Sequence, residues 1–225
     1  MSRRLDHVVV PTTDLDRSAD QFLGLGFTVT PRSDHPFGTS NRLVVLGDAY
    51  IELVAVTRPD ALPRHGFATE VRNALDAGHP ISHIVVRSEH PDSDRRDLDD
   101  RITDVVEFWR PASLVGGSET RAGFVCLMTG PGDPVGVFLC HHLTPEAVWD
   151  AEAVEHANRA QALVGVAAEI GPATRSLLEE LELEPPVRHG PPALWIRSDA
   201  TTVRATVEDV KIRLAPIPVE PIVAE

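Results

Sequence analysis

The stretch Leu5-Asp6-His7-Val8-Val9-Val10 returns later in the chain as Ile81-Ser82-His83-Ile84-Val85-Val86. Both runs are short, rich in β-branched residues, and interrupted only by a polar pair whose second member is histidine. A run of this kind is typical of a strand buried on both faces, and Pro11 ends the first one. The position-for-position match indicates an internal repeat, in which each copy opens on a strand with a central histidine.

The residues that follow the first run predict a unit of order β-α-β-β-β. Asp14 is expected to cap a helix, since apolar residues recur at helical spacing through Leu23, and Gly24 supplies a stop signal. Three further strands are predicted at residues 27–30, 43–46 and 50–56, with the Gly47-Asp48 turn joining the last two.

The same order is predicted after the second run, and a third α/β unit is expected to follow it. In the second unit we expect a helix at residues 92–102 and strands at 105–109, 123–128 and 137–142. In the third we expect a strand at residues 163–170, a helix at 172–181, a strand at 194–197, and one or two strands within 203–214. The predicted fold class is therefore α+β, with paired β-α-β-β-β modules at residues 1–60 and 78–146 and a C-terminal unit at 160–215.

Composition limits the classes of partner. The 225 residues are 42% hydrophobic and 24% charged, as in ordinary globular proteins. A formal net charge of −13 would repel nucleic acids and anionic membranes, and no cluster of Lys and Arg offers a basic face. No signal peptide or membrane span is evident, so we expect a cytoplasmic protein with a small-molecule partner. Cys126 and Cys140 are expected to be reduced thiols rather than a disulfide.

Two successive units of this order resemble the paired modules of the vicinal oxygen chelate superfamily, which includes glyoxalase I and the extradiol dioxygenases. Residues 35–43 with 50–53, and residues 140–146 with Trp149 and His156, are similar to a bacterial glyoxalase-like branch of that superfamily. The resemblance extends over about residues 5 to 165. It implies that two curved half-barrels enclose a cavity with a divalent metal on its floor, and that the protein could form a homodimer.

The resemblance also implies a set of metal ligands. By position, His7 and Glu52 match the ligand sites of the first module, and His83 matches the first-strand site of the second. Cys140 stands where the superfamily has a glutamate, so His142 is a candidate for the fourth ligand. Two imidazoles and a carboxylate would suit Fe, Mn, Zn or Ni. The alternative is that both histidines are hydrogen-bonded core residues and Glu52 is salt-bridged, although a carboxylate in an apolar strand is costly without a partner.

Other polar residues are candidates for catalysis or substrate binding. His35, on a glycine-bearing loop, could exchange a proton at neutral pH, and Asn41 could bind a substrate oxygen. Stabilising the loop is the alternative role for both. Cys140 could line the substrate site or be an inert buried thiol. His142 shares the strand parity of Cys140, so it could act as a general base from the cavity wall or simply pack there.

These features favour a metal-dependent lyase, isomerase or ring-cleaving dioxygenase that acts on a small organic substrate with adjacent oxygens. A rival interpretation is a non-enzymatic protein that sequesters a drug or metabolite, as the bleomycin-resistance members of the superfamily do. A third is a structural or regulatory subunit whose C-terminal unit docks on a partner. Stoichiometric metal that is lost in His7→Ala would favour the enzyme.

Overall fold

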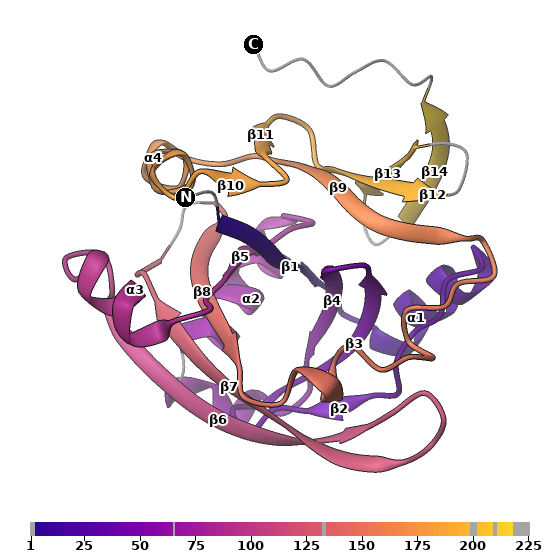
Figure 1. The fold of residues 1–225 in the computed structure, drawn as a ribbon, viewed down its shortest axis with the longest axis horizontal. Coiled ribbons are helices and arrows are strands. Elements are labelled where there is room, and N and C mark those ends of the chain that lie inside the picture. Colours follow the sequence, from indigo (N-terminus) through magenta and orange to yellow (C-terminus); the bar gives the residue numbers. More distant parts are fainter. Residues whose placement is uncertain (1–2, 65, 132–133, 199–201, 209–210, 218–225) are drawn as a thin grey trace.

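The structure is a computed structural model that describes residues 3–64, 66–131, 134–198, 202–208 and 211–217. Its main feature is a nine-stranded sheet that curls around an interior space (Figure 1). Eight strands follow the order β2-β3-β4-β1-β5-β8-β7-β6, and β10 pairs with β1. Their bounds are β1 Arg3–Pro11, β2 Ser33–Asp34, β3 Thr39–Leu46, β4 Ala49–Val56, β5 His83–Arg87, β6 Asp104–Ser113, β7 Glu119–Met128, β8 Gly136–His142 and β10 Leu183–Glu184.

The two repeated units form the two halves of this sheet. In the first half β1 pairs in parallel with β4, and in the second half β5 pairs in parallel with β8. The halves join where β1 and β5 run antiparallel, with Val9 opposite His83. The helices of the two halves are α1 (Leu15–Gly24), α2 (Gly66–Ala77) and α3 (Pro91–Asp97), with short 3-10 turns η1 (Pro59–Arg64) and η2 (Pro145–Ala147). The predicted repeat of a strand with a central histidine is thus the seam of the fold.

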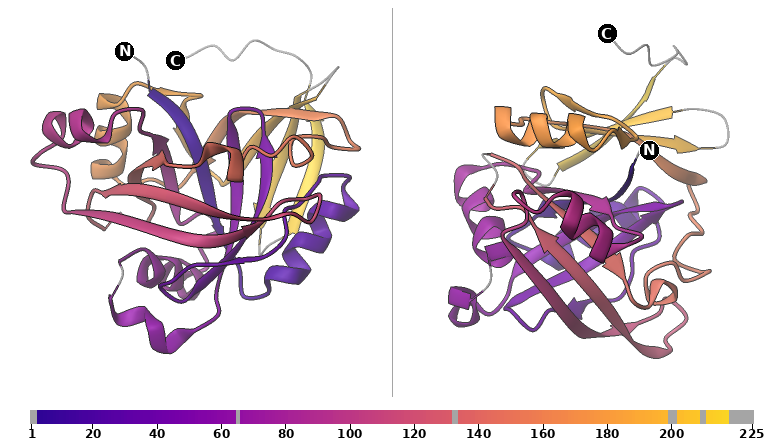
Figure 2. Two further views of the ribbon diagram at one scale, coloured as in Figure 1. Left: turned by 60° about the horizontal axis from the view of Figure 1, so that its bottom comes forward. Right: turned by 60° about the vertical axis from the view of Figure 1, so that its left-hand side comes forward.

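The C-terminal part of the chain forms a second, smaller sheet. Its order is β11-β9-β12-β13-β14, and it lies outside the curved sheet, next to β1 and α1 (Figures 1 and 2). The bounds are β9 Ala160–Ala168, α4 Pro172–Glu180, β11 Val187–His189, β12 Ala193–Ser198, β13 Thr202–Glu208 and β14 Lys211–Ile217. These elements agree with the predicted strand, helix, strand and further strands of the third unit.

Residues along the central strands alternate between two cores because successive side chains point to opposite faces of a sheet. Ile51 and Leu53 of β4 belong to the outer core, which also contains Leu163 and Leu194 of the C-terminal sheet. Val54 belongs to the inner core on the concave side. The outer core is closed by the second sheet and α1, so polar residues that share the inner face are left to line the interior.

Two sequence predictions for local structure are wrong. Residues 27–30 do not form a strand; the backbone N–H of Thr28 bonds to Nδ1 of His156, and Thr30 N–H bonds to the carbonyl of Leu43. These are separate hydrogen bonds to different partners and not the regular ladder of a strand pair. The strand before β3 is β2, Ser33–Asp34. The predicted helix at residues 92–102 ends at Asp97, where Leu98 begins a turn.

No helix in the described part of the chain is long and apolar enough to cross a membrane.

Candidate functional site

The concave side of the curved sheet contains a cavity of about 40 Å³. This exceeds the roughly 15 Å³ that one water molecule needs, so the space suits a small molecule. Its walls are largely aromatic, with a few polar side chains and three sulfur atoms. The lining residues are Phe37, Phe67, Phe108, Phe124 and Phe138, then His7, His35, Tyr50, Glu52 and Arg110, and then Cys126, Met128 and Cys140. Of the seven predicted site residues, His7, His35, Glu52 and Cys140 line this cavity.

A β-bulge in β1 turns two consecutive polar side chains to the concave side. Opposite β5, the register shifts between Leu5 and His7, so Asp6 is the extra residue. Nδ1 of His7 lies 2.6 Å from Oδ1 of Asp6, and the His7 ring stacks on Tyr50 with 4.3 Å between centroids. The bulge therefore supplies His7 with a buried carboxylate that fixes its ring.

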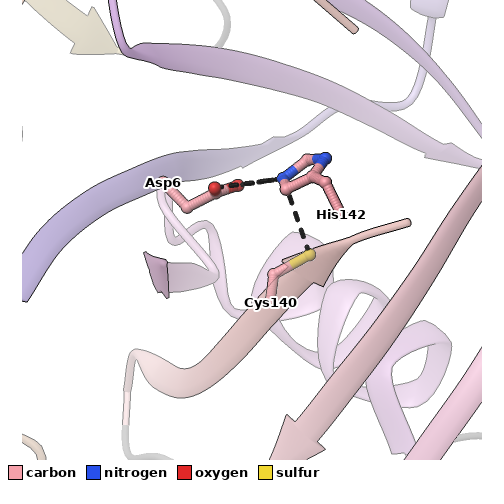
Figure 3. Close-up of side chains that lie close together, drawn as sticks. All are labelled: Asp6, Cys140 and His142. Atoms are coloured by element: carbon pink, nitrogen blue, oxygen red, sulfur yellow. Dashed lines mark hydrogen bonds and ion pairs between the residues drawn. The ribbon is translucent and has the colours of Figure 1, made fainter. Parts of the chain in front are cut away.

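Asp6 is completely buried and holds three basic side chains. Nε2 of His142 lies 3.0 Å from both of its oxygens (Figure 3). Nε of Arg87 donates to Oδ2 at 2.9 Å. Burial raises the pKa of Asp6, but the contacts with His142 and His7 lower it more, and the net pKa lies well below its usual range. Because an ionised carboxylate can only accept, His7 carries its proton on Nδ1, and Nε2 is left free on the cavity side.

Glu52 of β4 is the second polar group of the cavity. Its Oε2 lies 3.6 Å from Nε2 of His7, and its Oε1 lies 3.6 Å from Nε2 of His35. Nδ2 of Asn41 donates to Oε1 at 2.5 Å, whereas Oδ1 of Asn41 is buried without a partner. Oγ1 of Thr39 lies 2.8 Å from Nδ1, the other ring nitrogen of His35. The structure thus gathers His7, His35 and Asn41 around the carboxylate of Glu52.

His83, the third predicted metal ligand, does not join this group. Nε2 of His83 lies 3.0 Å from Oε2 of Glu70 on α2, and its Nδ1 lies 3.0 Å from Oγ of Ser82. The ring of Phe138 packs edge-on against both histidines, 5.8 Å from the centroid of His7 and 5.6 Å from that of His83. Both ring nitrogens of His83 are therefore engaged away from the pair formed by His7 and Glu52.

Cys140 and His142 lie on β8 with the same parity, as the sequence predicted. Both cysteines are buried and free, which confirms the expected reduced thiols. The hydrogen bond with Cys126, which lies opposite on β7, and then burial raise the pKa of Cys140 well above its usual range. His142 does not line the cavity; it bonds to Asp6 and its Nδ1 is buried without a partner. Cys140 is therefore a neutral thiol, and His142 supports the carboxylate behind His7.

Two residues of this site were not found from the sequence. Asp6 lies within an apolar strand. The reasoning that singled out Glu52, that a buried carboxylate is costly without a partner, would have indicated Asp6 as well. Arg110 of β6 lines the cavity and is only 4% exposed. It follows the strand predicted at residues 105–109 directly, but no sequence signal indicated that it faces the interior.

Among the described residues, one set of three potential ligands has its donor atoms within 4.8 Å of one another. This set is Asp6, Cys140 and His142 (Figure 3). Asp6 already accepts hydrogen bonds from His7, Arg87 and His142, and a dication there would stand beside the Arg87 guanidinium. The raised pKa of Cys140 also disfavours the thiolate that a metal requires. This set does not fit a divalent ion, and in this structure His83 of the predicted set pairs with Glu70 rather than with Glu52.

Comparison with known proteins identifies the family. The model of the family described as "Glyoxalase-like domain" matches residues 5–181, which include both repeated units and continue into the C-terminal part. The chain belongs to the glyoxalase-like domain family. Its curved, paired-module sheet is the fold of the vicinal oxygen chelate superfamily, as the sequence predicted. No curated protein sequence matches the chain.

Two solved structures are similar to this glyoxalase-like protein at low sequence identity. A hypothetical protein from Staphylococcus aureus has a TM-score of 0.58 and 13% identity, with 90% of this chain and 81% of that chain covered. Methylmalonyl-CoA epimerase from Mycobacterium tuberculosis has a TM-score of 0.40 and 18% identity, with 64% of this chain and 91% of that chain covered. The first likeness extends over both sheets of the glyoxalase-like chain.

His156, from the glyoxalase-like sequence pattern, holds a connecting segment in place. Its Nε2 donates to the carbonyl of Val45 at 2.7 Å, and its Nδ1 accepts from Thr28 N–H at 2.9 Å. Burial lowers the pKa of His156, so the neutral ring that this pairing requires is favoured. Asn158 bonds to the carbonyl of Leu25 at 2.9 Å. These two side chains fasten the segment before β9 to the first half of the sheet.

Proposed function

We propose that this protein is an enzyme of the lyase or isomerase type, which moves a proton on a small, oxygen-rich organic molecule. The observation that carries the proposal is the approach of His7 Nε2 to Glu52 Oε2, at 3.6 Å, on the wall of an otherwise aromatic cavity. An imidazole and a carboxylate, side by side and shielded from bulk water, suit general acid–base catalysis.

Each polar residue has a distinct role in this proposal. Glu52 takes a proton from a carbon next to a carbonyl, and the doubly protonated form of His7 returns one from Nε2. The proton left on Glu52 then passes to Nε2 of His7, which restores the pair. Asp6 keeps the His7 ring oriented and stabilises its protonated form, as a carboxylate does for a catalytic imidazole. His35 lies beside Glu52 on the cavity wall, and Asn41, which does not line the cavity, donates to Glu52 and holds its carboxylate in place.

Two further predicted residues, both on β8, support this chemistry. Cys140 contributes to the substrate-binding surface as a neutral thiol. His142 acts as a positioning residue because it holds Asp6 and does not line the cavity.

The predicted divalent metal (Fe, Mn, Zn or Ni) is not part of the proposed proton transfer. A three-donor site at His7, Glu52 and His83 would require His83 to leave Glu70, 3.0 Å away, and to pass the Phe138 ring. The remaining pair of donors leaves an ion with too few protein ligands for a catalytic site, which commonly has three. Ring-cleaving dioxygenase chemistry is disfavoured for the same reason, because it depends on a firmly held iron.

The experiment is proton exchange in D₂O, followed by loss of C–H signals in NMR spectra. The candidate substrates are small 2-oxo acids, 2-hydroxy ketones and 2-hydroxy acids, which have an exchangeable C–H next to adjacent oxygens. We expect the wild-type protein to exchange at least one of them, and Glu52→Gln to slow this exchange by about 10²- to 10⁴-fold. The amide keeps the shape of the side chain and removes only its basicity.

Glu70→Gln is the matched control, since Glu70 also pairs with a histidine but does not line the cavity. Its exchange rate should equal that of the wild type. The proposal fails if Glu52→Gln exchanges as fast as wild type, or if no candidate exchanges although small molecules bind in the cavity.

The second outcome would support the other candidate function, a non-enzymatic protein that binds a drug or metabolite. The five phenylalanine rings around the cavity favour this alternative. In that case binding should depend on the aromatic wall and should tolerate Glu52→Gln, with no chemical change in the ligand.

A further inference from the structure

Arg110 is a buried cation without a carboxylate partner. It is 4% exposed, and Nη1 donates to Oγ of Ser33 at 2.5 Å and to the carbonyl of Pro111 at 3.4 Å. Both acceptors are neutral. Among the described residues, no Asp or Glu oxygen lies within 4.0 Å of this guanidinium, although other arginines of the chain have such partners, for example Arg87. The hydrogen bonds of Arg110 therefore all go to neutral groups, and no carboxylate contacts its charge directly.

One donor of this guanidinium has no partner at all. Nε of Arg110 is buried and makes no hydrogen bond. Burial lowers the pKa of Arg110, and Glu52, the carboxylate of the cavity, is the strongest of the charges that raise it. An isolated charge is costly in a protein interior, and an unsatisfied donor adds to that cost. A ligand that brings a negative charge and acceptor oxygens to the guanidinium would remove both costs.

The surroundings of Arg110 favour a planar anion. Its guanidinium carbon lies 5.4 Å from the centroid of Phe124, and Phe108 stacks on Phe124 with 5.1 Å between centroids. Both rings line the same cavity as this cation, whose fork-shaped donor set matches a carboxylate. Arg110 and the pair of His7 and Glu52 line the same small cavity, so one molecule can contact both.

We propose that Arg110 anchors a carboxylate of the ligand, so that the ligand class is small organic acids rather than neutral ketones or aldehydes. The identification of this ligand as a substrate rests on the proposed function; the anion site itself does not. The guanidinium holds the acid group and directs the adjacent carbon toward Glu52 and His7. The acidic chain would repel such a ligand at its surface, and Arg110 provides the buried counter-charge that selects it.

The test compares acids with amides of the same shape. Binding of acetate, propionate and benzoate, and of acetamide, propionamide and benzamide, is measured by isothermal titration calorimetry with the full chain. We expect at least one acid to bind about tenfold to a hundredfold more tightly than its amide, which is the range for hydrogen bonds to a charged group. Equal binding of each acid and its amide, or no binding of any acid at millimolar concentration, would overturn the proposal.

Variants locate the site. Arg110→Gln should abolish the preference for acids, Arg110→Lys should retain part of it, and the exposed Arg121→Gln on β7 should leave it unchanged. A preference that survives in Arg110→Gln would also overturn the proposal. If Arg110→Gln does not fold, the acid-over-amide preference is compared between Arg110→Lys and the wild type, and a preference as large in Arg110→Lys as in the wild type would overturn the proposal. Glu52→Gln should keep the preference for acids while it loses proton exchange, so that failure of the anion site and failure of the proposed reaction are distinguishable.

Discussion

Asp6→Asn tests whether the buried carboxylate behind His7 organises the site. The change keeps the size of the side chain but removes the charge that holds Arg87 at 2.9 Å and His142 at 3.0 Å. Removing one partner of a buried ion pair costs about 3–5 kcal/mol, because the other charge is left uncompensated. With a slope of about 3 kcal/mol per molar urea for a chain of this size, the unfolding midpoint should fall by about 1 to 2 M.

The control is Asp48→Asn, since the side chain of Asp48 is 78% exposed and lies 3.3 Å from an exposed Arg4. Its midpoint should stay nearly constant, because exposed pairs contribute only about 0–1 kcal/mol. Urea unfolding followed by circular dichroism measures both variants. A fall in the stability of Asp6→Asn of less than 1 kcal/mol, or an equal fall in Asp48→Asn, would refute this account of the network.

The pH dependence gives an independent check on Asp6. Its folded-state pKa lies well below the ordinary value of 3.8 that applies to the unfolded chain. The unfolded chain therefore binds a proton first as pH falls, so the stabilisation is complete above pH 3.8 and is lost progressively below it. The difference in stability between the wild type and Asp6→Asn should shrink in that acidic range. A difference that grows on acidification would contradict the assigned direction.

Three further outcomes are expected. Gly38→Ala should lower the melting temperature more than Gly78→Ala. Both glycines have positive φ, but only at Gly38 would the added Cβ lie 2.6 Å from a backbone oxygen, that of Arg58. Thermal unfolding should show that Gly38→Ala loses about 1–3 kcal/mol more stability than Gly78→Ala. Cys140 should react with a thiol reagent only after unfolding, because its raised pKa and burial keep it neutral and inaccessible; fast labelling of the native protein would show otherwise. After equilibration with Fe(II), Mn(II), Zn(II) or Ni(II) and dialysis, elemental analysis should find well below one ion per chain; a full equivalent that disappears in His7→Ala would restore the three-donor metal site.

Much of the architecture followed from local patterns. The repeat of a buried strand with a central histidine predicted the two modules. The structure adds that these two strands form the seam between them, where Val9 lies opposite His83. Residues 27–30 were misassigned as a strand because local propensity cannot report that His156, far along the chain, takes a backbone donor of that segment. The resemblance placed Cys140 at the cavity, which it lines, and strand parity predicted the same for His142, which bonds to Asp6 instead.

The site itself divides in the same way. The sequence by itself determined which polar residues lie on buried strands, because a charge or imidazole in an apolar run is visible without coordinates. Only the tertiary structure decided how they group. A one-residue bulge turns Asp6 toward the interior beside His7, α2 brings Glu70 to His83 and draws it away from Glu52, and β6 carries Arg110 to the same cavity. These outcomes depend on strand register and on contacts between distant segments, which no local pattern of residues encodes.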